Sequence, residues 1–262
     1  VLTVPDNAKW LYISGWERYQ SYVVLSMTKK DGALTNFKGK KIVWLGTSIP
    51  AAGYYNVANE NSYPRKVGRL LGATVYNEAV GSSPIHCRHR TEITSENPYG
   101  FGTDFESSSR CLSNTVADMN WIISHYNSGV FTSTVPAEMT DELAASIRAC
   151  SYEQKIDKYF NNGEKIDMWV IDHGHNDWPY ASEEAEYETD KFSVFTFKGA
   201  CNFIINHIRE KDPFAQIVVI GEYENERQPY LCECQTAVAN YWNVPIMDSW
   251  NRYGINEKTI TT

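Results

Sequence analysis

Three residues that lie far apart in the chain have the side-chain chemistry of an acyl-transfer site. Ser48, Gly81 and Asn176 each follow an apolar segment of the sequence. A serine hydroxyl can act as a nucleophile, while a backbone N–H and a carboxamide can donate hydrogen bonds to the oxyanion of a tetrahedral intermediate. Glycine suits position 81, because a Cβ there could block the approach of the oxyanion to the backbone N–H. Each residue alone also fits a turn or a helix cap, so the ordered set of three is what indicates a site.

The elements that must position these residues form an alternation of strands and helices. Apolar runs predict strands at residues 41–46, 73–77, 166–171, 216–221 and 244–247. Helical spacing, caps and glycine stops predict helices at 62–72, 113–126, 140–149, 152–160, 193–210 and 227–242. This order is typical of a parallel sheet covered on both faces, and such sheets bind ligands beyond the carboxyl ends of their strands. Ser48, Gly81 and Asn176 should therefore converge on one edge of the sheet.

The same segments resemble blocks I, II and III of the SGNH hydrolase family, also called GDSL-type esterases. Block I is usually G-D-S and reads Gly46-Thr47-Ser48 here; block III is usually G-x-N-D and reads Gly174-His175-Asn176-Asp177. The resemblance runs from about Lys40 to the last residue. It implies a flavodoxin-like three-layer α/β/α sandwich with a parallel five-stranded sheet. It also implies that Ser48 is the nucleophile, and that the backbone N–H groups of Ser48 and Gly81 and the side chain of Asn176 form an oxyanion hole.

The general base is the main departure from the family pattern. The family places its histidine in a D-x-x-H segment after the fifth strand, whereas this sequence has Asp248-Ser249-Trp250-Asn251 there and no later histidine. A serine nucleophile needs such a base at neutral pH. We expect that the chain lacks the segment with the catalytic histidine. The pair Asp172 and His175, His86, and His89 remain alternatives, as does a relative that is not catalytic.

Two other catalytic or binding motifs do not fit the region of Ser48. Position 50 is Pro, so Ser48 does not lie in the G-x-S-x-G elbow of α/β-hydrolases. Residues 46–53 lack the Gly-Lys-Ser/Thr ending of a phosphate-binding loop.

Composition and charge limit the classes of partner. The 262 residues carry 24 Lys and Arg against 32 Asp and Glu, a net charge of −8, which disfavours a nucleic-acid partner. No apolar run approaches the ~20 residues that span a bilayer. The six cysteines form no CxxC pair, and we expect neither a metal nor a cofactor.

Two parts of the chain are expected outside or beside this pattern. Residues 1–38 contain short β-branched and aromatic runs and are expected to be a β segment, the end of a preceding β-rich domain; residues 39–262 are expected to form the SGNH-like domain. Residues 82–110 show no clear period, and we expect a long loop there that selects the substrate.

The sequence thus predicts a serine esterase that removes acyl groups, acetyl among them, from carbohydrate or another small ester. The alternative is a module on the same scaffold that binds carbohydrate or serves in adhesion without catalysis, in a larger surface or phage-tail-like protein.

Overall fold

The computed structural model describes residues 37–52, 60–86, 93–177, 184–222 and 229–249. The expected β segment at residues 1–38 lies almost entirely outside these ranges, as does His89.

Five parallel strands form a single sheet, in the order β2-β1-β3-β4-β5. The strands are β1 (Lys41–Gly46), β2 (Thr74–Asn77), β3 (Met168–Asp172), β4 (Ile217–Ile220) and β5 (Ile246–Met247). Their core residues are apolar and mostly β-branched, which suits strands that are buried on both faces. The strand order is that of the flavodoxin-like doubly wound fold. The fold class expected from the sequence is confirmed.

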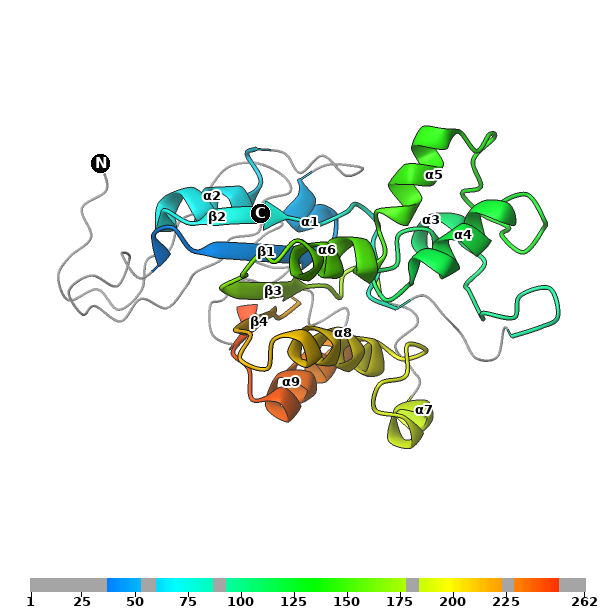
Figure 1. Cartoon of the computed structure of the whole chain (residues 1–262). Helices are drawn as coiled ribbons and strands as arrows, with labels where there is room; N and C mark the ends of the chain where they lie inside the picture. The colour runs from blue at the N-terminus through cyan, green and yellow to red at the C-terminus, as the bar shows by residue number, and fades with distance from the viewer. Residues whose placement is uncertain (1–36, 53–59, 87–92, 178–183, 223–228, 250–262) are drawn as a thin grey trace, which may run out of the picture.

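Helices cover both faces of the sheet (Figure 1). On one face, α2 (Tyr63–Leu71) packs on Ile42 and Trp44 of β1. On the other face, α6 (Lys158–Asn161), α8 (Phe197–Lys211) and α9 (Pro229–Trp242) pack on Val43 and Leu45. Successive residues of β1 thus point to opposite layers, as the pleat of a strand requires.

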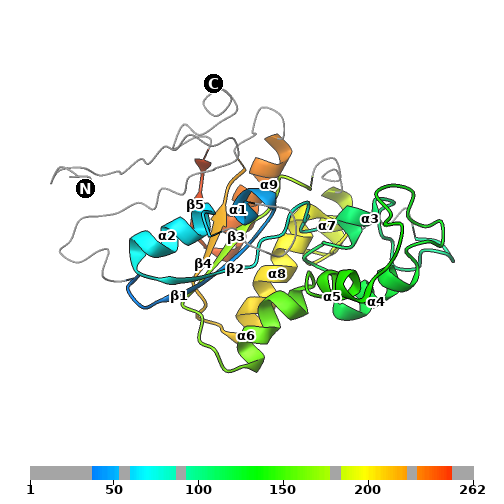
Figure 2. The ribbon, with the colours of Figure 1, turned by 90° about the horizontal axis from the view of Figure 1, so that it is seen from above.

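The connection between β2 and β3 carries a separate group of helices: α3 (Phe105–Ser108), α4 (Val116–Ser124) and α5 (Asp141–Arg148). Figures 1 and 2 show this group beside the sheet, beyond the end at which α1 (Ser48–Ala51) lies. It has an aromatic core of its own around Phe101, Phe105 and Phe131. A π-helical segment, Glu153–Asp157, leads from it into α6. A further short helix, α7 (Glu184–Thr189), precedes α8.

Capping residues explain where α4 and α8 begin. Helix α4 starts later than the apolar spacing predicts, because Thr115 and Asp118 form a capping box at its first turn. Helix α8 begins after Thr196, whose hydroxyl accepts a hydrogen bond from the Gly199 N–H.

Candidate active site

Ser48 is the second residue after β1 and the first residue of α1, and it is partly exposed. Gly46 pairs with Asp172 of the neighbouring strand. A Cβ at position 46 would lie 2.4 Å from Cγ of Pro50 and 2.9 Å from the Asp172 carbonyl oxygen. Glycine at position 46 therefore allows the chain to turn sharply from β1 into the segment that carries Ser48.

Gly81 belongs to a segment that continues the pairing of β2 with β1. The Glu78 N–H donates to the Trp44 carbonyl at 2.8 Å, and the Val80 N–H donates to the Gly46 carbonyl at 3.0 Å. Gly81 is buried and is the next residue after Val80. The backbone of Gly81 is thereby tied to the end of β1, two residues before Ser48.

Asn77 gives a second link between the same two segments, which the sequence alone did not single out. Its side-chain Nδ2 donates to the Pro50 carbonyl at 2.7 Å and to Oγ of Ser62 at 3.1 Å. Asn77 thus holds α1 against the end of β2. An asparagine at the last position of a strand is a sequence signal that could have indicated this role.

Asn176 follows β3 and reaches the segment after Gly81. Its Nδ2 donates to the Ser83 carbonyl at 3.4 Å. The preceding Gly174 has φ of +144°, a conformation that favours glycine, and a Cβ there would lie 3.0 Å from Nε2 of Gln235 in α9. Gln235 in turn donates to the His173 carbonyl at 2.7 Å. The segment with Asn176 is therefore positioned by both the sheet and α9.

Asp177 is the strongest link between the segments after β2 and β3. Its side chain is fully buried, and its Oδ1 accepts hydrogen bonds from the Ile85 N–H at 2.9 Å and the His86 N–H at 3.0 Å. The same oxygen lies 2.9 Å from Nδ1 of His86. One buried carboxylate thus fixes the path of the chain four to five residues after Gly81.

The histidines and the acid considered as a base have specific partners. His86 is fully buried, with its Nδ1 directed at Asp177. His173 is buried and lies against the Ser83 backbone; burial lowers its pKa to about 4, and the charge of Asp177 offsets this only in part.

Asp172 accepts a hydrogen bond from Nε1 of Trp44 at 2.8 Å, and burial raises its pKa to about 7. The Asp172 carboxylate thus has Trp44 as a partner, and His175, three residues later in the chain, is partly exposed.

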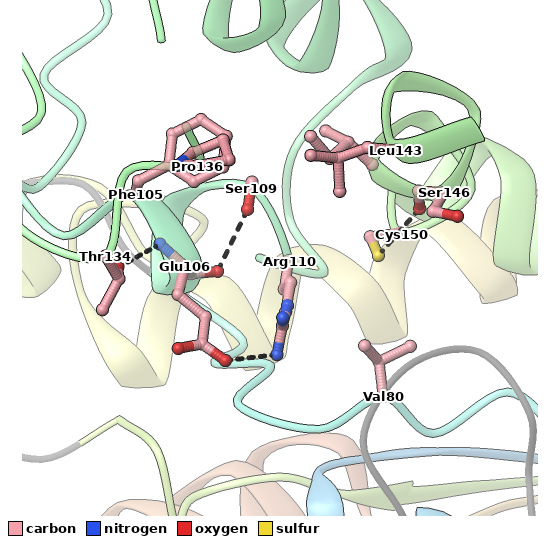
Figure 3. Close-up of a pocket in the computed structure, with 11 residues that line it drawn as sticks. Val80, Phe105, Glu106, Ser109, Arg110, Thr134, Pro136, Leu143, Ser146 and Cys150 are labelled. Carbon is pink, nitrogen blue, oxygen red and sulfur yellow. Dashed lines mark hydrogen bonds and ion pairs between the residues drawn. The ribbon is translucent and has the colours of Figure 1, made fainter. Parts of the chain in front are cut away.

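A pocket of ≈ 80 Å³ opens between α3 and α5, next to the Gly81 segment (Figure 3). Its apolar walls come from Val80, Phe105 and Leu143, and its polar groups include Glu106 and Arg110. Ser48, Gly81 and Asn176 do not line it, but Val80 adjoins Gly81 in the chain. The segment expected as a loop that selects the substrate therefore contributes α3 and one side of this pocket.

Three features bear on metal, membrane and disulfide chemistry. Within the described ranges, no group of three or more His, Cys, Asp or Glu side chains could hold a metal ion. No helix among the residues that the structure describes is both long enough and apolar enough to cross a membrane. Cysteines 111, 150, 201, 232 and 234 are free thiols.

Comparison with known proteins gives similarity in structure and none in sequence. No protein-family model matches the chain, and no curated protein matches it.

Solved structures similar to it include a protein from Parabacteroides merdae described as a GDSL-like lipase, at 13% identity, with 83% of this chain and 80% of that chain covered and a TM-score of 0.41. The acetylxylan esterase Axe2 from Geobacillus stearothermophilus matches at 14% identity, 86% and 82% coverage and a TM-score of 0.43. A family two carbohydrate esterase from Cellvibrio japonicus matches at 15% identity, 85% and 53% coverage and a TM-score of 0.42. At these identities and TM-scores, the chain is similar to GDSL-like lipases and carbohydrate esterases in outline, and its function has to be inferred from its own residues.

Proposed function

We propose that the protein is a serine esterase that removes acyl groups, such as acetyl, from carbohydrate. The main support is that hydrogen bonds join the three strand-end segments that carry Ser48, Gly81 and Asn176. Val80 bonds to Gly46, and Asn176 bonds to Ser83. A nucleophile and its oxyanion donors must be held in a fixed relation before the substrate arrives, and short links between their segments do this.

In the proposed reaction, Ser48 Oγ attacks the carbonyl carbon of the ester as its proton passes to a general base. The tetrahedral oxyanion accepts hydrogen bonds from the backbone N–H groups of Ser48 and Gly81 and from Nδ2 of Asn176. The C–O bond to the alcohol then breaks, the base returns the proton to the leaving oxygen, and an acyl-enzyme remains. Water repeats the sequence on the acyl-enzyme and releases the acid.

We propose that the general base is neither of the two buried histidines of this site, His86 and His173. Among the described histidines, His86 is buried against Asp177. His173, with a pKa of about 4 caused by burial, is too weak a base for this role at neutral pH. His89 is one histidine in the ranges that the structure does not describe.

The test is turnover of p-nitrophenyl acetate by the wild-type protein, Ser48→Ala and Asn176→Ala. We expect Ser48→Ala to abolish turnover and Asn176→Ala to lower kcat by roughly 10²–10³, because removal of one oxyanion donor costs about that much. Asn206→Ala is the matched control: this amide bonds to Glu210 on the surface of α8, and its loss should leave turnover unchanged. Equal rates for wild type, Ser48→Ala and Asn176→Ala would refute the proposal. Binding of an acetylated oligosaccharide without turnover would favour the non-catalytic carbohydrate-binding alternative.

A further inference from the structure

Arg110 is a buried cation that contacts the segment of Gly81. It follows α3, and its side chain is 6% exposed. Removing a guanidinium from water is costly unless its N–H groups find acceptors. The acceptors of Arg110 therefore indicate why the chain keeps a charge at this place.

Arg110 holds the Gly81 segment at two points. Its Nη1 donates to the Gly81 carbonyl at 2.9 Å, and its own backbone carbonyl accepts a hydrogen bond from Oγ of Ser83 at 2.7 Å. The Ser83 carbonyl is also the acceptor for Asn176. Arg110 and Asn176 thus bind the same short segment, Arg110 at Gly81 and Ser83 and Asn176 at Ser83.

Glu106 orients the guanidinium. Its Oε1 lies 2.5 Å from Nη1 of Arg110, one helical turn away along the chain (Figure 3). The Glu106 side chain is 30% exposed and lines the pocket between α3 and α5. The same nitrogen, Nη1, thus contacts both the Gly81 carbonyl and the Glu106 carboxylate, and it carries two N–H groups that can donate to them.

We propose that Arg110 is a positioning residue for the oxyanion donor at Gly81, and in that role it depends on the esterase function proposed above. The Val80 carbonyl, which shares a peptide with the Gly81 N–H, accepts a hydrogen bond from the Ser83 N–H at 3.3 Å, and the Gly81 carbonyl accepts one from Arg110. The peptides on both sides of Gly81 are therefore held. A glycine without these anchors has wide conformational freedom, and its N–H would no longer keep one direction.

The experiment compares wild type, Arg110→Met and Arg110→Lys, with Arg148→Met as the matched control. Arg148 bonds to Asn120 in an exposed contact and does not line the pocket. Backbone hydrogen exchange of residues 80–86 measures the positioning directly. The rate at which a fluorophosphonate labels Ser48, releasing fluoride, measures its effect on reactivity. Thermal unfolding establishes that each variant is folded.

In Arg110→Met, we expect exchange in residues 80–86 to be at least about tenfold faster, while exchange in α8 is unchanged, because a hydrogen bond to a charged donor is lost. Labelling of Ser48 should fall about 10²-fold, the cost of a small misplacement of a catalytic group. Arg110→Lys should give intermediate values, and Arg148→Met should match wild type. If Arg110→Met does not fold, Arg110→Lys decides by the same two measurements.

Hydrogen exchange tests the positioning role of Arg110, and labelling of Ser48 tests the esterase function, so the two proposals can fail separately. Unchanged exchange of residues 80–86 in a folded Arg110 variant would overturn the positioning role, whatever the activity. Absence of labelling in wild type would contradict the esterase function, while faster exchange in the variant would still support the link between Arg110 and Gly81.

Discussion

The sheet and the α3–α5 group are held together in different ways. The sheet is joined by a regular ladder of backbone hydrogen bonds and by aliphatic layers on both faces. The α3–α5 group depends on packed aromatic rings: Phe105 and Phe131 lie with centroids 5.4 Å apart, as do Phe101 and Trp121. The ladder fixes where each strand ends, and the aromatic group supplies the cation that holds one of those ends.

Residues 81–86 are where the two regions meet. From the sheet, Asp177 binds the backbone of Ile85 and His86. From the helical group, Arg110 binds Gly81, and the Leu112 N–H donates to the Pro84 carbonyl at 3.0 Å. The candidate oxyanion segment is therefore bound by both regions, so changes in either region should affect it.

The largest expected effect comes from cutting the link on the sheet side. Asp177→Ala leaves the buried N–H groups of Ile85 and His86 without an acceptor, and we expect a loss of about 3–5 kcal/mol in the free energy of unfolding. Asp177→Asn keeps an oxygen acceptor and should lose less. Urea titration measures both, with the exposed Asp141→Ala as control. A loss below about 1 kcal/mol for Asp177→Ala would show that this link is dispensable.

Matched cavities in the two cores test whether the regions unfold together. Ile204 lies in the sheet core and Met119 in the core of the α3–α5 group, and both are 0% exposed. Truncation of either to Ala should cost about 2–5 kcal/mol. Because residues 81–86 bond to both regions, we expect each variant to shift a single transition, followed by far-UV and near-UV circular dichroism. Two separate transitions in Met119→Ala would show instead that the helical group unfolds on its own.

A smaller effect is expected from Asp172, the last residue of β3, whose contribution to the free energy of unfolding should depend on pH. Burial raises the pKa of Asp172 from 3.8 to about 7, although its hydrogen bond from Trp44 lowers it. Between about pH 4 and pH 7 the folded state therefore binds a proton that the unfolded state has released. Stability from this group is present at low pH and is lost as the pH rises through 7.

Asp172→Asn, which keeps an oxygen for Trp44 and cannot ionise, should accordingly be more stable than wild type at pH 8. We expect a gain above about 1 kcal/mol, because one pKa unit corresponds to about 1.4 kcal/mol, and little difference at pH 4. Asp167→Asn is the opposite control: burial raises the pKa of Asp167, but the hydrogen bonds from Lys40 and the Lys41 N–H lower it overall. Its amide variant should lose stability at pH 8. Equal pH profiles for wild type and Asp172→Asn would contradict this account.

The sequence predicted the sheet well and its surroundings less well. Strands such as β1 and β4 are continuous apolar runs because both faces are buried, and their positions follow from composition alone. The short helix α1 depends on a tertiary contact, the bond from Asn77 to Pro50, and the late start of α8 depends on its cap, Thr196. Apolar spacing reports neither.

In the candidate site, too, the residues that follow strands could be predicted, and those that depend on tertiary contacts could not. The segments of Ser48, Gly81 and Asn176 could be proposed because each follows a predicted strand. Arg110 could not, because it lies in a region without a clear period and acts on a residue 29 positions away. The spacing of Glu106 and Arg110, an i,i+4 acid–base pair, was the one local signal of that role.

The most direct test of the central claim is covalent labelling of the wild-type protein with a fluorophosphonate, followed by peptide mapping. The proposed site predicts one modified residue, Ser48, and no modification in Ser48→Ala. Asn176→Ala should be labelled more slowly, because the phosphoryl oxygen would lose a donor. Failure of wild type to react, or modification of another serine with Ser48 untouched, would contradict the account.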